Sequence, residues 1–205
     1  ISISLLHAAE KEPSIIEKRM EATVCIGTVQ NVKLNSSADP VKSFVPCGTG
    51  LLVGIPDDPQ KRVCLVTAKH VFEDPTKNWH PTIINLRFTW NQHLPLEKYH
   101  GLAIKIRQGS RTNWISHPKS DLAAIPMFMP TSIIGKRTVS AVTPSQLAPP
   151  EHLVVGQPVT VLGFPVAVGG SLGSSFMTLP LARRGIISWQ PTSDDMPHVI
   201  LVDTM

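Results

Sequence analysis

Proline and glycine interrupt this chain so often that the apolar segments between them are short. The 205 residues include 19 prolines and 13 glycines. Many segments between them are rich in β-branched and aromatic residues, and several alternate apolar with polar side chains. A period of two is typical of strands with one buried face, whereas a helix needs apolar residues three and four apart over a longer stretch. The sequence therefore predicts an all-β fold.

Two neighbouring apolar runs predict a β-hairpin. They occupy residues 47–55 and 62–68, and the proline-containing turn PDDPQK separates them. Further strands are expected over 22–29, 83–90, 101–107, 121–127, 137–142, 153–165, 181–189 and 198–203. The alternation is clearest in two of them, and it predicts a buried face formed by Ile84, Leu86, Phe88, Trp90, Leu102, Ile104 and Ile106.

Two other segments have a different pattern. Residues 31–46 are polar and contain Pro40 and Pro46, which predicts a loop. Residues 14–21 begin with a capping-box pattern, Ser14-Ile15-Ile16-Glu17, which predicts a short helix.

Composition and charge argue against several classes of partner and cofactor. The net charge is only +4, and the basic residues cluster only in pairs, so nucleic acid is not expected as a partner. No apolar stretch reaches membrane-spanning length, and no cysteine or histidine cluster has the spacing of a metal site. We therefore expect no membrane partner, no metal and no cofactor.

Three cysteines are too few, and odd in number, for a disulfide framework. Cys47 and Cys64 lie on the two strands of the predicted hairpin but not directly opposite each other. We therefore expect Cys25, Cys47 and Cys64 to be free buried thiols. So few cysteines fit either an oxidising or a reducing compartment.

His70 is set apart from the other histidines by the residues that precede it. Gly48-Thr49-Gly50 begins one strand of the hairpin, and Thr67-Ala68-Lys69-His70 ends the other. A histidine held at the end of a rigid strand has the fixed position that a general base requires. Gly48 and Gly50 allow close packing of the strands and are not expected to take part in catalysis directly.

The run GTGLLV…CLVTAKHV resembles the trypsin-like (chymotrypsin-fold) serine peptidases, nearest to the bacterial HtrA-type domains. The resemblance implies that His70 is the base of a catalytic triad. Asp121, in HPKSDLAAI, matches the family's triad aspartate, which accepts the imidazole Nδ1–H and stabilises the imidazolium. The runs VGQPVTVLGFP and RRGIISW also resemble the family's second barrel.

This resemblance implies a double six-stranded β-barrel of trypsin-like fold, with a short N-terminal helix and a second barrel that is incomplete in this sequence. The expected division is an N-terminal extension over 1–21, a first β-barrel over 22–125, a proline-rich linker over 126–150 and a second β-barrel over 151–205.

The family's nucleophilic serine lies in a Gly-x-Ser-Gly-Gly loop, which is expected shortly after Asp203, whereas the sequence ends at Met205. We therefore expect the natural chain to continue past Met205. Gly169-Gly170-Ser171-Leu172-Gly173 fits another nucleophile motif, Gly-x-Ser-x-Gly, but no helical period follows it, so a flexible loop is the favoured interpretation. A cysteine in the missing loop is the remaining variant.

The function that the resemblance implies is a serine endopeptidase, which hydrolyses peptide bonds by acyl transfer and takes a protein or peptide substrate. The competing hypothesis is a protease-like binding or scaffold domain without catalysis. The presence of both His70 and Asp121 favours the enzyme. Cleavage specificity, compartment and oligomeric state are left open.

Overall fold

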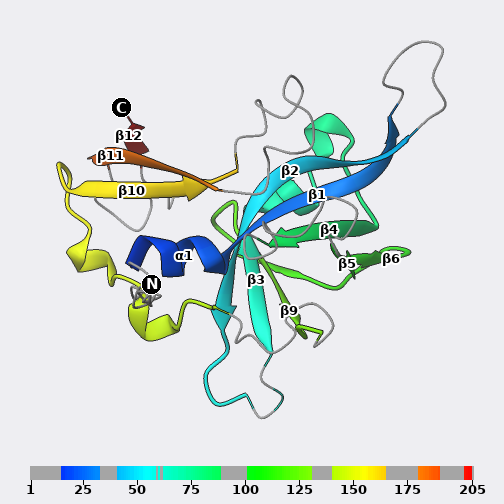
Figure 1. Cartoon of the computed structure of the whole chain (residues 1–205), viewed down its shortest axis with the longest axis horizontal. Helices are drawn as coiled ribbons and strands as arrows, with labels where there is room; N and C mark the ends of the chain where they lie inside the picture. The colour runs from blue at the N-terminus through cyan, green and yellow to red at the C-terminus, as the bar shows by residue number, and fades with distance from the viewer. Residues whose placement is uncertain are drawn as a thin grey trace, which may run out of the picture.

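Two β units lie side by side in the computed structural model of this chain (Figure 1). The structure describes residues 15–32, 41–58, 60, 62–88, 101–130, 140–164, 180–189 and 201–204. A large curled sheet forms one unit, a three-stranded sheet forms the other, and the helix α1 (Ile15–Ala22) leads into the large sheet.

The large sheet has the strand order β5-β4-β1-β2-β3-β9-β8, and all its neighbouring strands are antiparallel. Its strands are β1 (Thr23–Val32), β2 (Val41–Gly54), β3 (Val63–Thr67), β4 (Ile83–Phe88), β5 (Leu102–Lys105), β8 (Ile115–Ser116) and β9 (Ala123–Met127). The shorter elements of this unit are α2 (Lys69–Phe72), η1 (Pro75–Lys77), β6 (Arg107–Gln108) and β7 (Arg111–Thr112). The sheet has seven strands, one more than a six-stranded barrel, because the two-residue β8 extends the β9 edge.

The predicted alternation decides which side chains form the core of this sheet. On β4, Ile84, Leu86 and Phe88 are fully or almost fully buried, as the period of two predicts. On β5, Leu102 and Ile104 pack against the same core, and Ile106 is buried just after the strand ends. The inward side chains of β3 and β9 complete the core; they are Val63, Leu65, Thr67, Ala123, Ile125 and Met127. Trp90, also predicted to be buried, lies outside the described residues.

The prediction of a loop over 31–46 is wrong at both ends, because residues 31–32 end β1 and residues 41–46 begin β2. Pro46 has no N–H to donate to a ladder, yet the strand continues because its register shifts there. Ile26 pairs with Gly48 and Gly27 with Pro46, so Cys47 is the extra residue of a bulge. The ladder with β3 begins only at Leu51, so Pro46 is paired on one side of the strand alone. A bulge therefore accommodates a proline that the sequence pattern assigned to a loop.

The β2–β3 hairpin is confirmed, with Leu51–Gly54 paired to Val63–Val66. Its turn is closed by an ion pair in which the Arg62 guanidinium donates to both carboxylate oxygens of Asp58, at 3.1 and 3.0 Å. The Arg62 backbone N–H also donates to Asp58, at 2.6 Å. These contacts keep the turn compact despite its prolines.

The smaller sheet has the order β10-β11-β12, again antiparallel. Its strands are β10 (Pro158–Gly163), β11 (Leu181–Trp189) and β12 (Leu201–Thr204). Between the two sheets, η4 (Pro144–Gln146) lies in the segment predicted as a linker, and η5 (Pro150–His152) begins at its last residue. This segment contacts the large sheet, because Val142 accepts from the Gly54 N–H at 2.9 Å and donates to the Leu52 carbonyl at 2.8 Å. The division of the chain into two barrels and a linker remains a prediction.

The predicted helix over 14–21 is present as α1, Ile15–Ala22. Ser14, the first residue of the predicted capping box, lies outside the described residues, as do 131–139, which include the first half of the strand expected over 137–142. No helix among the described segments is both long and apolar enough to span a lipid bilayer.

Truncating Ile84 and its neighbour Ile83 tests the alternation on β4. Ile84 is 0% exposed and Ile83 is 49% exposed. We expect Ile84→Ala to lower the free energy of unfolding by about 2–5 kcal/mol, because it removes buried methyl groups and leaves a cavity. Ile83→Ala is the matched control and should change it by less than about 1 kcal/mol. Urea unfolding measures both, and equal effects would contradict the assigned face.

Candidate active site

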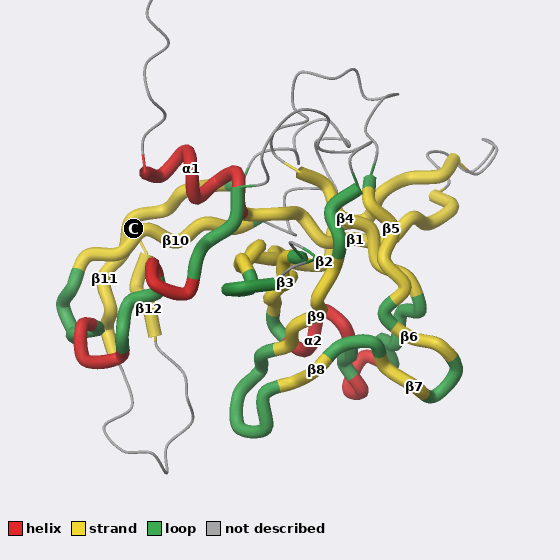
Figure 2. Tube along the Cα trace, turned by 90° about the horizontal axis from the view of Figure 1, so that it is seen from below, coloured by secondary structure: helices red, strands yellow, loops and turns green. Residues whose placement is uncertain are grey.

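His70 lies in the single turn of α2, three residues after β3 ends at Thr67. The sequence placed it at the end of the strand itself, and that detail is wrong. Ala68 is extended (φ −66°, ψ 139°), and the chain then turns because the Val71 N–H donates to the Ala68 carbonyl at 3.0 Å. Figure 2 shows α2 beside β9. The turn therefore carries His70 from the end of the β3 ladder toward the chain entering β9.

Buried side chains and hydrogen bonds hold α2 in place. Val71 and Phe72 are buried, and the Phe72 ring packs on Trp114 with 5.7 Å between centroids. The Trp79 indole N–H donates to the Val71 carbonyl at 2.9 Å. Glu73, directly after α2, accepts from the Arg107 guanidinium at 3.1 Å. The residues that follow His70 are thus fixed against the core.

Asp121 reaches His70 because of the β3–β9 register. Thr67 pairs with Ala123 in this antiparallel ladder. When the same register is continued, Lys69, two residues after Thr67, lies opposite Asp121, two residues before Ala123. The Lys69 N–H accordingly donates to the Asp121 backbone carbonyl at 3.3 Å. The ladder therefore sets the spacing of the two predicted site residues.

The Asp121 carboxylate contacts His70 at two points. Its Oδ2 lies 2.5 Å from the imidazole Nδ1, and its Oδ1 accepts from the His70 backbone N–H at 3.0 Å. Two contacts fix both the ring and the carboxylate. With the Asp121 carboxylate ionised, the Nδ1 contact requires the proton on Nδ1, which leaves Nε2 free to accept a proton.

The charge of Asp121 is stabilised by these contacts although much of the pair is exposed. Partial desolvation raises the pKa of Asp121, but hydrogen bonds from the His70 ring and backbone N–H outweigh it and leave the pKa below its usual value. The side chains of His70 and Asp121 are 56% and 55% exposed. Asp121 is therefore ionised at neutral pH, and both side chains of the pair are open to solvent.

The glycines of Gly48-Thr49-Gly50 each stand against another element. A Cβ on Gly48 would lie 2.6 Å from Val71 Cγ2, the residue after His70. A Cβ on Gly50 would lie 2.5 Å from Leu65 Cδ1 in the core. Both distances are too short for real atoms, so the packing role expected for these glycines matches the contacts found.

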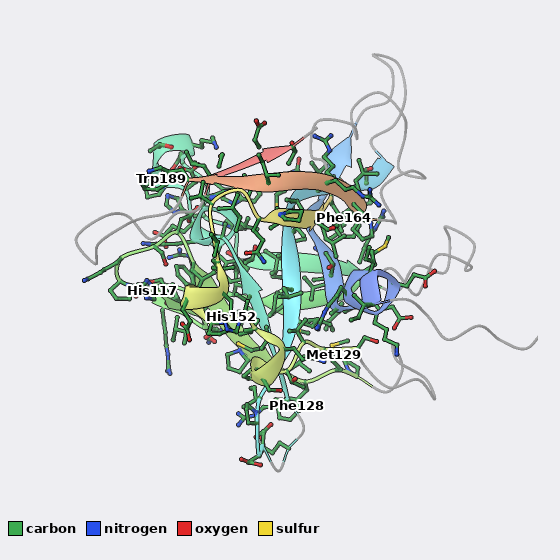
Figure 3. All side chains as sticks on the ribbon, turned by 90° about the vertical axis from the view of Figure 1, so that its left-hand side faces the viewer. His117, Phe128, Met129, His152, Phe164 and Trp189 are labelled. Carbon is green, nitrogen blue, oxygen red and sulfur yellow. The ribbon has the colours of Figure 1, made fainter. Side chains whose placement is uncertain are left out.

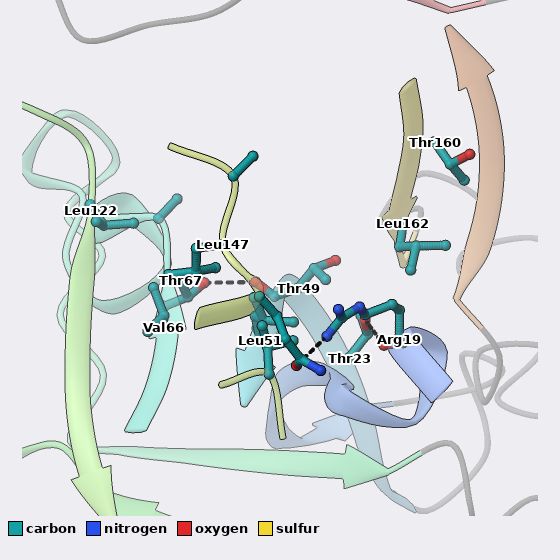
Figure 4. Close-up of a pocket in the computed structure, with 15 residues that line it drawn as sticks. Arg19, Thr23, Thr49, Leu51, Val66, Thr67, Leu122, Leu147, Thr160 and Leu162 are labelled. Carbon is teal, nitrogen blue, oxygen red and sulfur yellow. Dashed lines mark hydrogen bonds between the residues drawn. The ribbon is translucent and has the colours of Figure 1, made fainter. Parts of the chain in front are cut away.

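A cavity of about 520 Å³ lies next to the pair (Figure 4). Ala68 and Leu122, close in sequence to His70 and Asp121, form part of its wall, and Leu162 of β10 forms another part. Arg19 of α1 also lines it and donates to the Gln146 side chain at 2.9 Å. The cavity therefore lies between the large sheet, α1, the η4 segment and the smaller sheet.

The three cysteines are free, as expected, although only Cys25 is fully buried. Desolvation raises the pKa of Cys25 to about 12, and desolvation raises the pKa of Cys47 to about 11. Burial also raises the pKa of Cys64. A thiol nucleophile needs a lowered pKa, so none of the three has the environment of a reactive cysteine. The described part of the chain also holds no group of side chains suited to binding a metal ion.

Other residues considered from the sequence lie outside the described part. The Gly169–Gly173 loop with Ser171 is among them. Sequence reasoning did not assign a role to Glu73, nor to the hydroxyl of Thr49. The only signal for Thr49 was its place between two glycines.

The three known structures that we compared are HtrA-type proteases. The chain is similar to "HtrA-type protease AlgW with decapeptide", with a TM-score of 0.53 and 14% identity over 92% of this chain and 50% of that one. Variants of that protease with a decapeptide and a tripeptide give TM-scores of 0.48 and 0.46 at 13% and 14% identity, over 90% and 91% of this chain and 47% and 43% of theirs. No protein-family model and no curated protein matches the sequence.

The first of these comparisons confirms the all-β, trypsin-like fold predicted from the sequence, with an HtrA-type protease as structural neighbour. The chain spans about half the length of those proteases, 50% in the first comparison.

Adding a methyl group at Gly48 tests the packing beside His70. We expect Gly48→Ala to lower the free energy of unfolding by about 1–3 kcal/mol, because the new Cβ overlaps the β-branched Val71. Val71→Ala in the same chain should recover part of this loss. Gly54→Ala is the control, since its Cβ would meet only the Val142 carbonyl at 3.9 Å. Chemical denaturation measures all four proteins, and equal destabilisation by both alanines would argue against the contact.

Acid should weaken the turn that follows α2. Hydrogen bonds from Thr76 and then Lys77 lower the pKa of Asp74 to about 2, from a model-peptide value of 3.8. Because the folded state holds the carboxylate more strongly, its contribution is complete above pH 3.8 and is lost as pH falls toward 2. Asp74→Asn should be less stable than wild type at pH 6, and the difference should shrink by pH 2.5. Urea unfolding at several pH values tests this; a constant difference would contradict it.

Proposed function

We propose that this chain carries the base and the orienting acid of a serine endopeptidase. The observation that supports the proposal is the two-point contact of Asp121 with His70, on Nδ1 at 2.5 Å and on the backbone N–H at 3.0 Å. This is the arrangement that holds an imidazole in one tautomer and stabilises the imidazolium formed during acyl transfer. The trypsin-like fold is consistent with it.

In the proposed reaction, His70 Nε2 takes the proton of a serine hydroxyl as the serine oxygen bonds to the substrate carbonyl carbon. His70 then gives this proton to the leaving amine as the peptide bond breaks. Water completes the cycle by hydrolysing the acyl-enzyme, with His70 again as the base. We propose that the serine and the donors that stabilise the oxyanion are provided by residues that follow Met205 in the natural chain.

The substrate is proposed to be a protein or peptide. The similar protease structures are described as containing a decapeptide or a tripeptide. The half-exposed side chains of His70 and Asp121 leave room for a substrate chain to approach.

A second candidate function is a protease-like binding module without catalysis. The observation that favours it is the 55% exposure of the Asp121 side chain, because the described residues do little to shield the pair from water. A fluorophosphonate probe on the natural full-length protein separates the candidates. Label on a serine after Met205, lost in His70→Ala, supports the peptidase; no label, with peptide binding retained, supports the binding module; label on Ser171 would contradict both.

Replacing the Asp121 carboxylate by an amide should abolish most of the activity while leaving the protein folded. In the natural full-length protein we expect Asp121→Asn to lower kcat by about 10⁴-fold, because the amide no longer selects the Nδ1–H tautomer. Asp57→Asn is the control, an exposed turn residue with φ 54° that asparagine also tolerates. Peptide hydrolysis and thermal unfolding are measured together. Asp121→Asn with wild-type kcat would exclude the triad.

A further inference from the structure

The Thr49 side chain joins the two sheets at a point close to the His70–Asp121 pair. Its Oγ1 accepts a hydrogen bond at 2.8 Å from the backbone N–H of Phe164, directly after β10. Its backbone carbonyl accepts, also at 2.8 Å, from the hydroxyl of Thr67, the last residue of β3 (Figure 4). Thr49 of β2 therefore binds both Phe164, which follows β10, and Thr67, the last residue of β3. The segment after β3 carries His70.

The surroundings of Thr49 are built for close approach. A Cβ on Gly163 would lie 3.4 Å from Thr49 Oγ1, an ordinary van der Waals distance, so β10 ends directly against the hydroxyl. Phe164 is 5% exposed and Thr67 is 4% exposed, so both donors are shielded from water. Figure 3 shows Phe164 where the smaller sheet meets the strands of the large one. A shielded N–H that loses its acceptor is costly, which fixes this contact in one geometry.

From Thr49 a continuous path of paired strands runs to the end of β12. β10 pairs with β11 along its whole length, from Pro158 to Gly163, and β11 pairs with β12. On the other side, Thr67 lies two residues before Lys69, whose N–H binds Asp121. Thr49 is thus a link between the smaller sheet and the segment that leads to His70.

We propose that Thr49 is a positioning residue that aligns the smaller sheet, and the nucleophile that follows β12, with His70. This inference rests on the proposed function, since it assigns a role within the same site. The two hydrogen bonds described for Thr49 reach Phe164 and Thr67, not His70 or Asp121. Its hydroxyl acts through Phe164, and its carbonyl acts through Thr67.

Three variants of the natural full-length protein test the role of the hydroxyl. Thr49→Val keeps the shape and removes the acceptor, and Thr49→Ser keeps the acceptor. Thr28→Val is the matched control, because Thr28 lies farther along the same β1–β2 ladder, opposite Val45, and its hydroxyl accepts from the Gln30 side chain. Amide hydrogen exchange at Phe164 and the NMR signals of the His70 ring are measured first, and peptide hydrolysis second.

We expect Thr49→Val to speed exchange at Phe164 by about 10-fold or more and to shift the His70 ring signals. Its kcat should fall by about 10–100-fold with KM changed less than about 3-fold, because misplacement of about 1 Å affects the reacting geometry more than binding. Thr49→Ser should restore all of these values, and Thr28→Val should leave them unchanged.

Two results would overturn the inference. Unchanged exchange at Phe164 in Thr49→Val would mean that the hydroxyl does not hold it. Faster exchange with unchanged His70 signals, or with unchanged kcat in an active protein, would reduce Thr49 to a structural contact. If the wild-type protein hydrolyses no peptide, the proposed function fails, while exchange and His70 signals still decide whether Thr49 links the two sheets.

Thr67→Val provides the second test if Thr49→Val does not fold. It removes the hydroxyl that donates to the Thr49 carbonyl and leaves the Phe164 contact in place. We expect shifted His70 signals with Phe164 exchange close to wild type. Unchanged His70 signals would show that the hydrogen bond between the Thr67 hydroxyl and the Thr49 carbonyl does not affect the position of the His70 ring.

Discussion

The antiparallel pairing of β3 with β9 is the constraint on which the site depends. It runs from Val63–Met127 to Thr67–Ala123, and continuing the same register places Lys69 opposite Asp121. A shift of β9 by one residue against β3 would turn the buried side chains of β9 outward, so the core resists any other register. The hydrophobic packing of a sheet interior thereby decides a contact between two half-exposed polar residues.

A second layer of contacts makes this arrangement rigid. Gly48 lets β2 pack against Val71 beside His70, and the ring of Phe72 anchors the same turn on Trp114. Glu73 then ties the end of the turn to Arg107. These groups fix the backbone that follows His70, and the Lys69 N–H, bound to the Asp121 carbonyl, fixes the residue before it, so little backbone freedom has to be lost when the imidazole acts. A general base is effective only if it is held within hydrogen-bonding reach of its proton donor.

Thr49 illustrates how one polar residue can serve two sheets. Apolar packing between sheets is non-directional and allows sliding, whereas a hydrogen bond to a shielded N–H has one preferred geometry. The hydroxyl and the carbonyl of Thr49 provide two such bonds in two directions. The 520 Å³ cavity beside it shows that the interface between the large sheet and β10 is not filled by side chains alone.

The sequence by itself determined the all-β class, the β2–β3 hairpin, the alternating core of β4 and the pairing of His70 with Asp121 as candidates. The class, the hairpin and the core follow from local patterns, because a period of two can be read without knowing distant contacts. The pairing of His70 with Asp121 follows from the resemblance of their motifs to the trypsin-like peptidases. The tertiary structure decided what depends on partners far along the chain. Pro46 lies in a strand because a bulge opposite Gly27 accommodates it. Thr49 acquires its role only because Phe164, 115 residues away, is folded against its hydroxyl, and no local pattern encodes that approach.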